Sequence, residues 1–92
     1  MAHSLSAKKR IRQNVKERAR NRARRSNLRT RVRGFDEALA GGDAALTETK
    51  YREACRSLDR EANRGVIHRN AAARQKRALA QRLNALRQRT SG

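Results

Sequence analysis

The side chains with the clearest chemistry are the Lys and Arg residues between positions 8 and 33. They make up half of this segment, and Glu17 is its only acid. The segment contains no Pro or Gly and many good helix formers, and on a helix its bases up to Arg25 fall all round the circumference. A helix that is polar all round is rarely stable by itself. The pattern therefore indicates contact with a polyanion, and the alternative is a solvated, disordered basic tail.

The composition of the whole chain agrees with a polyanionic partner. Its 92 residues include 25 bases and 8 acids, for a formal charge of +17. Such an excess repels itself in a compact monomer and attracts phosphate-rich partners, with nucleic acid the first candidate and an anionic membrane surface the second. No apolar run reaches the length of a membrane span, and the start lacks the apolar segment of a signal peptide. The single Cys55 fits a reducing compartment, so we expect a cytoplasmic protein.

Catalytic and metal-binding chemistry has little support in the sequence. There is no Gly-rich phosphate loop and no plausible Ser, His and Asp set. His3 and His68 lie far apart without a cysteine at ligand spacing, and Cys55 falls on an apolar stripe, where a buried thiol is inert. We therefore expect no catalytic residue, no cofactor, no metal and no small-molecule substrate.

The aromatic residues indicate how nucleic acid would be read. Phe35 and Tyr51 are the only ones, and both fall on apolar helix stripes. Proteins that bind single strands stack nucleobases on exposed aromatic side chains. Because this chain has no aromatic residue outside its apolar stripes, we expect it to recognise nucleic acid through phosphate contacts and backbone shape. The polar residues Ser26, Asn27 and Thr30, which lie among arginines, could add directed hydrogen bonds to the nucleic acid or be ordinary surface residues. His68 could be a structural residue of the link or a contact to phosphate or ribose. The candidate contacts are Lys8, Lys9, Arg10, Arg12, Lys16, Arg18, Arg20, Arg22, Arg24, Arg25, Ser26, Arg29, Thr30, His68, Arg69, Asn70, Arg74, Lys76 and Arg77.

Hydrophobic spacing and helix-end signals predict three helices in a single domain, 1–92. The helices are expected at about 7–40, 44–64 and 70–89, with residues 1–6 mobile. Ser6, Asp43 and Asn70 are candidate N-caps, and the glycines at 41, 42 and 65 are expected to end the first two helices. Short links favour antiparallel neighbours. The expected fold is an all-α three-helix bundle with a long, basic, protruding first helix.

The apolar stripes of these helices predict the core. Val66 and Ile67 form an apolar plug in the second link, and the stem of Lys76 fills a gap in the third stripe. The predicted core residues are Leu28, Val32, Phe35, Leu39, Tyr51, Cys55, Leu58, Leu79, Leu83 and Leu86.

Charge is divided unevenly along the chain. Residues 1–35 carry +12, residues 36–61 carry −3, and residues 62–92 carry +8. The middle helix therefore need not touch the polyanion and can hold the two basic helices together, with Glu48–Arg52 and Glu53–Arg56 as pairs on its outer face. Like-charge pairs and a lack of large apolar residues predict that residues 1 to about 25 become helical only on the polyanion.

Three segments resemble a known family. They are SAKKR at residues 6–10, RSNLRT at 25–30 and GVIHRNAAAR at 65–74, in this order and at these separations. Together they resemble the bacterial small-subunit ribosomal protein S20 family over roughly residues 6–86. Arg replaces Lys at many positions, and the tail at 87–92 looks additional.

The resemblance implies a three-helix bundle with a long first helix. It also implies direct binding to 16S ribosomal RNA, a place on the ribosome beside other components of the small subunit, and a role in subunit assembly. The alternative from the charge alone is a DNA-compacting protein of the nucleoid. A membrane-active basic peptide is a weaker alternative, because the basic helix lacks a large apolar face.

Overall fold

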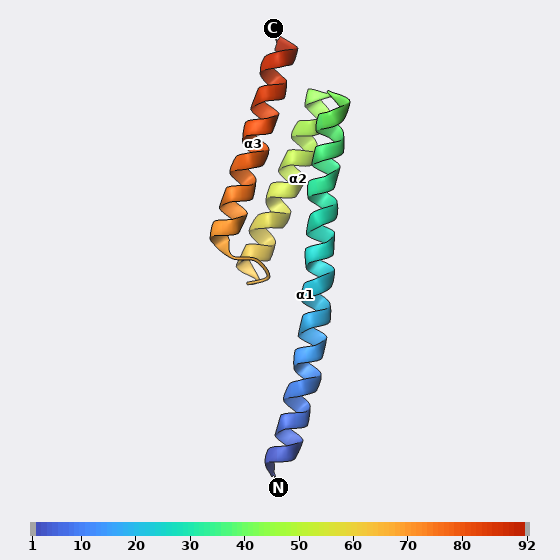
Figure 1. The fold of residues 1–92 in the computed structure, drawn as a ribbon, viewed down its shortest axis with the longest axis vertical. Coiled ribbons are helices and arrows are strands. Elements are labelled where there is room, and N and C mark those ends of the chain that lie inside the picture. Colours follow the sequence, from blue (N-terminus) through green and yellow to red (C-terminus); the bar gives the residue numbers. More distant parts are fainter. Residues whose placement is uncertain (1, 92) are drawn as a thin grey trace.

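The computed structural model describes residues 2–91 and consists of three α-helices (Figure 1). They are α1, Ala2–Gly41, α2, Ala44–Asn63, and α3, Arg69–Ser91. Two short links join them, and α2 lies between α1 and α3 and antiparallel to both. The prediction of an all-α fold with a long first helix is confirmed. Within the described residues, no helix has the length and apolar character needed to cross a membrane.

The N-terminal part of α1 extends far beyond the bundle (Figure 1). The molecule measures 73 × 21 × 13 Å and has a radius of gyration of 18.4 Å, whereas a compact chain of this length has about 12 Å. Every side chain of residues 6–20 is exposed, and we call this segment the arm. At 1.5 Å per residue, the arm is a rod about 22 Å long.

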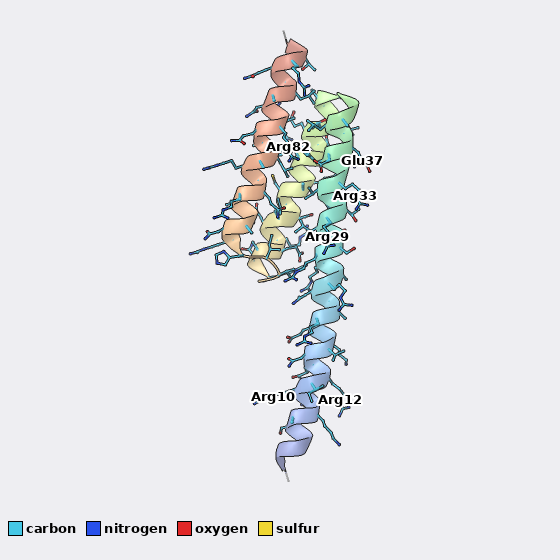
Figure 2. All side chains as sticks on the ribbon, in the orientation of Figure 1. Arg10, Arg12, Arg29, Arg33, Glu37 and Arg82 are labelled. Carbon is cyan, nitrogen blue, oxygen red and sulfur yellow. The ribbon has the colours of Figure 1, made fainter. Side chains whose placement is uncertain are left out.

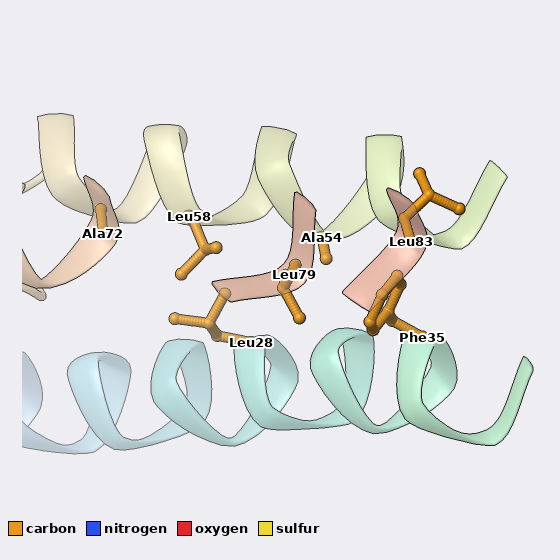
Figure 3. Close-up of a cluster of buried hydrophobic side chains, with 7 residues drawn as sticks. All are labelled: Leu28, Phe35, Ala54, Leu58, Ala72, Leu79 and Leu83. Carbon is orange, nitrogen blue, oxygen red and sulfur yellow. The ribbon is translucent and has the colours of Figure 1, made fainter. Parts of the chain in front are cut away.

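The core lies where the three helices meet, and Figure 3 shows side chains from all three pointing into it. Burying these apolar surfaces removes them from water, which stabilises the bundle. Leu86 of α3 is also buried, and Val32, Leu39 and Tyr51 are partly buried against the core, so these predictions are confirmed. The central cluster consists of Leu28, Phe35, Ala54, Leu58, Ala72, Leu79 and Leu83.

Cys55 differs from its prediction as a core residue. It is only half-buried and lines a groove between α2 and α3. Its neighbour Ala54 is completely buried instead, because the stripe of α2 that faces both partners is centred on Ala54 and Leu58. Burial raises the pKa of the Cys55 thiol, which keeps it protonated and unreactive.

Two polar residues of α2 are buried although the sequence did not indicate it. Thr47 is fully buried, and its hydroxyl donates to the backbone carbonyl of Asp43 at 2.6 Å. Glu61 is 5% exposed, and its Oε1 accepts from Arg64 Nη1 at 3.1 Å. The Thr47 hydroxyl is thus satisfied within its own helix, whereas Oε2 of Glu61 is buried without a hydrogen-bond partner.

The ends of α2 agree with the sequence. Asp43 is the N-cap of α2, with Oδ1 accepting from the Leu46 N–H at 3.2 Å. Gly42 and Gly65 have φ of 78° and 76°, the left-handed conformation that ends a helix. Val66 is buried in the second link, and Ile67 packs partly buried against the core, as predicted for this apolar plug.

Two predicted N-caps are wrong. Because α1 begins at Ala2, Ser6 lies inside the helix and not at its end. Because α3 begins at Arg69, the residue before it is His68, whose Nδ1 accepts from the Asn70 N–H at 3.0 Å. The imidazole nitrogen thus supplies the acceptor expected from Asn70, and Asn70 is itself a first-turn residue.

Candidate nucleic-acid interface

The arm presents positive charge on all sides. Seven of the predicted contacts lie within it, every one exposed: Lys8, Lys9, Arg10, Arg12, Lys16, Arg18 and Arg20. Figure 2 shows Arg10 and Arg12 on the arm, well away from α2 and α3. Ile11 and Val15 are also 61% and 59% exposed. The arm can therefore meet phosphates from several directions while offering a small apolar patch.

A second group of bases lies where the arm joins the bundle. Arg22 and Arg29 are exposed, and with Arg18, Asn21 and Arg25 they line a depression of about 570 Å³. Arg25 also donates from Nη2 to the carbonyl oxygen of Val66 at 3.2 Å, which ties the link between α2 and α3 to α1. Arg24 is half-buried. Because Arg25 makes this hydrogen bond to Val66, its role is partly structural.

Of the two neutral polar candidates on α1, Thr30 is engaged within its own helix. The Thr30 hydroxyl donates to the backbone carbonyl of Ser26 at 3.1 Å. Both side chains remain exposed. Because the Thr30 hydroxyl hydrogen is directed to its own helix, it can offer a ligand only its oxygen lone pair.

The start of α3 forms a third group at the same end of the bundle. His68, Arg69 and Asn70 are exposed, although His68 also caps its helix. Arg74 and Arg77 are exposed one and two turns further along and line a depression of about 260 Å³ with Asn70. The contact between Arg25 and Val66 places this group close to the base of the arm.

Lys76 is the predicted contact whose charge the bundle itself uses. Its Nζ lies 2.8 Å from Asp59 Oδ1 in α2. This hydrogen bond and the charge of Asp59 raise the pKa of Lys76. The ammonium therefore stays protonated but has a partner within the fold, unlike the bases of the arm.

Other acids of the bundle also pair with bases, either of the same helix or of a neighbouring one. Asp36 lies 3.0 Å from Arg82, and Glu48 lies 3.0 Å from Arg87 and 2.9 Å from Arg52, the last as predicted. Glu53 lies 3.7 Å from both Arg31 and Lys50, whereas the sequence had predicted Arg56. The acids thus offset bases within the bundle, and the surplus positive charge remains on α1 and at the start of α3.

One exposed base of α1, Arg33, was missing from the predicted contacts. It continues a series that runs Arg18, Arg22, Arg25, Arg29, Arg33. Steps of three and four residues keep side chains on one face of a helix, so the spacing could have revealed it. The described residues contain no group of three or more His, Cys, Asp or Glu side chains able to hold a metal.

Comparison with known proteins agrees with this geometry. The ribosomal protein S20 family matches residues 2–84. The small ribosomal subunit protein bS20 of Thermobifida fusca is 48% identical over 88 residues, covering 96% of each chain. Those of Shouchella clausii and Kineococcus radiotolerans are 46% and 51% identical, covering 94% and 87% of this chain and 98% and 93% of their own. The similarity thus spans the arm as well as the bundle.

Proposed function

Because this chain belongs to the ribosomal protein S20 family of small ribosomal subunit proteins, we propose that it binds 16S ribosomal RNA directly and supports assembly of the subunit. It is a structural protein of the ribosome and not an enzyme. In this proposal the arm enters the RNA, and the base of the arm and the start of α3 hold the bundle against it.

The observation that carries the proposal is the exposed arm. Its fifteen residues contain seven bases and one acid, and every side chain is exposed. Neutralising phosphates with such bases releases condensed counterions, and that release drives binding to nucleic acid. A rod with bases on every side gains most when RNA surrounds it, which is the environment that a folded ribosomal RNA offers.

The contacts should involve phosphate and shape more than base stacking on aromatic rings. Phe35 is fully buried, and Tyr51 packs near it with ring centroids 6.4 Å apart. We propose all the predicted contacts as RNA-binding residues. Lys76 and Thr30 should contribute least, because Asp59 and the Ser26 carbonyl already engage them.

Two binding measurements test this function. The purified chain should bind 16S ribosomal RNA in a filter assay more tightly than a DNA duplex of equal charge, and in a lysate it should sediment with small subunits. Preference for the DNA duplex, with no sedimentation beside subunits, would support the nucleoid alternative.

A matched pair of variants tests the role of the arm. Arg12→Ala removes an exposed base of the arm and should weaken RNA binding. The slope of log K against log salt concentration, which we call the salt slope, should become shallower by about one. Arg52→Ala removes an exposed base of α2 that pairs with Glu48 and should leave RNA binding nearly unchanged. Equal losses for the two variants would contradict a binding surface centred on the arm.

A further inference from the structure

A groove of about 410 Å³ lies between α1 and α3, where the link between α2 and α3 meets α1. It shares Arg25 and Arg29 with the depression at the base of the arm, so the two form one continuous surface. Figure 2 shows Arg29 and Arg33 on α1, and Arg82 on α3. The volume of the groove falls within the range of about 300–1,000 Å³ that is typical of small-molecule sites.

The floor of this groove is apolar. Leu28, Val32 and Ile67 line it. Leu28 is 7% exposed, and Val32 and Ile67 are half-buried, so a bound group can reach them without unfolding the core. A phosphate gains no binding free energy from contact with such an apolar surface, whereas the flat face of a nucleobase gains it.

The α1 side of the groove retains positive charge. Arg25, Arg29 and Arg33 line it. Its one acid, Asp36, already pairs with Arg82 at 3.0 Å. Guanidinium groups bind phosphates and also stack on bases, so these arginines suit both parts of a nucleotide.

The α3 side contributes the amide of Gln75, which is exposed. An amide offers a donor and an acceptor together, the combination that matches the edge of a base. A groove that bound only phosphates would need donors alone. Gln75 therefore gives the groove a hydrogen-bond acceptor, which contacts to the phosphates of the RNA backbone would not use.

The groove between α2 and α3 provides an internal comparison. It is of similar size, about 440 Å³, and contains Tyr51, Cys55 and Lys76. However, Lys76 pairs with Asp59, and Arg52 pairs with Glu48. Two of its four bases are thus paired within the fold, whereas Arg56 and Arg77 also line it and are exposed. Its lining contains no amide side chain, so it lacks the group that would meet the edge of a base.

We propose that the groove between α1 and α3 receives one unstacked nucleotide of the bound RNA, an inference that rests on the proposed function. The base lies on Leu28, Val32 and Ile67, its edge meets Gln75, and its phosphate meets an arginine of α1. Sequence-specific RNA recognition usually targets unstacked bases of this kind. The groove thus adds base recognition to a protein whose other contacts follow the backbone.

The test uses the full chain and 16S ribosomal RNA. Gln75→Ala should weaken binding by about five- to a hundredfold, the range for losing a good base contact, with the salt slope unchanged. Gln81→Ala is the matched control, since Gln81 is an exposed glutamine of α3 that does not line the groove. Arg29→Ala should weaken binding and also lower the salt slope by about one.

Chemical probing of the RNA supplies a second measurement. The unaltered chain should protect the base edge of one unpaired nucleotide from methylation, and Gln75→Ala should restore its reactivity while Gln81→Ala does not. If Gln75→Ala and Gln81→Ala give equal affinities and equal base protection, the nucleotide site is overturned and the proposed function stands. Failure of the unaltered chain to bind the RNA would overturn both.

Discussion

Arg29 and Arg31 are two residues apart on α1 but have different surroundings. Arg31 lies 3.7 Å from Glu53 of α2, whereas Arg29 lines the open surface at the base of the arm. Two residues correspond to about 200° on a helix, so neighbouring arginines meet opposite sides of the bundle. At the residue scale, the side of α1 decides whether an arginine stabilises the fold or remains available to RNA.

Truncation of a buried leucine should destabilise the bundle strongly. Leu58 is fully buried, so Leu58→Ala leaves a cavity and should lower the free energy of unfolding by about 2–5 kcal/mol. Leu46→Ala is the control, because Leu46 also belongs to α2 but is 46% exposed; its change should be small. Chemical denaturation measures both, and similar effects of the two substitutions would contradict the assigned inner face of α2.

The pair between Glu48 and Arg87 should make stability depend on pH. The hydrogen bond from Arg87, followed by its charge, lowers the pKa of the Glu48 carboxyl from its ordinary value of 4.5. Because the folded pKa lies below the unfolded one, the pair stabilises the fold above pH 4.5 and loses this effect as pH falls through the folded pKa.

A double-mutant cycle measures this coupling. Glu48→Gln and Arg87→Ala, singly and together, should show favourable coupling near neutral pH that decreases as pH falls below 4.5 and through the folded pKa of Glu48. Coupling of the same size across this whole range would show that ionisation of Glu48 does not govern the interaction.

At the scale of elements, α1 contains two parts with different support. Leu28 and Phe35 anchor its second part in the core, whereas residues 6–20 are entirely exposed. Like charges four residues apart, such as Lys8 and Arg12, also repel each other on the arm. A helix without tertiary packing is marginal in water, so the arm should open far more readily than the rest of α1.

Amide exchange should reveal this difference. In the free protein, amides of residues 10–22 should exchange quickly, and those of residues 28–39 should be protected. In the assembled subunit both segments should be protected, because RNA neutralises the bases and surrounds the arm. Strong protection of residues 10–22 without RNA would contradict coupling between arm ordering and RNA binding.

At the scale of the whole molecule, α1 and α3 carry the positive charge, and α2 does not. Residues 1–35 carry +12, whereas residues 36–61 carry −3, and the molecule is 73 Å long. The first link lies at the far end from the arm (Figure 1). The field of the protein should therefore favour approaches to RNA in which the arm leads.

The whole-molecule charge predicts a steep salt dependence of RNA binding. If roughly eight phosphates are neutralised, log K against log salt should have a slope near −6 to −7, by analogy with single strands and duplex DNA. Filter-binding titrations over a range of salt concentrations measure it. A slope shallower than about −2 would mean that the bases of α1 take little part in binding.

The sequence by itself determined the helices, most of the core and the region of excess charge. Apolar residues three and four apart identified Leu28, Phe35 and Leu58 as inward-facing, because helical periodicity is a local property. Gly42 and Asp43 likewise marked a helix end and the next N-cap through local backbone and hydrogen-bonding preferences. The bases of residues 8–33 also needed no structure to be recognised as a surface for a polyanion.

Only the tertiary structure decided which charges the fold uses and which surfaces remain open. Lys76 and Arg25 read as RNA contacts in the sequence, but Asp59 and the Val66 carbonyl lie 17 and 41 residues away along the chain and engage them. The groove beside Gln75 likewise combines side chains of α1, the second link and α3. Such contacts depend on how the helices pack against each other, and periodicity within a single helix carries no information about that.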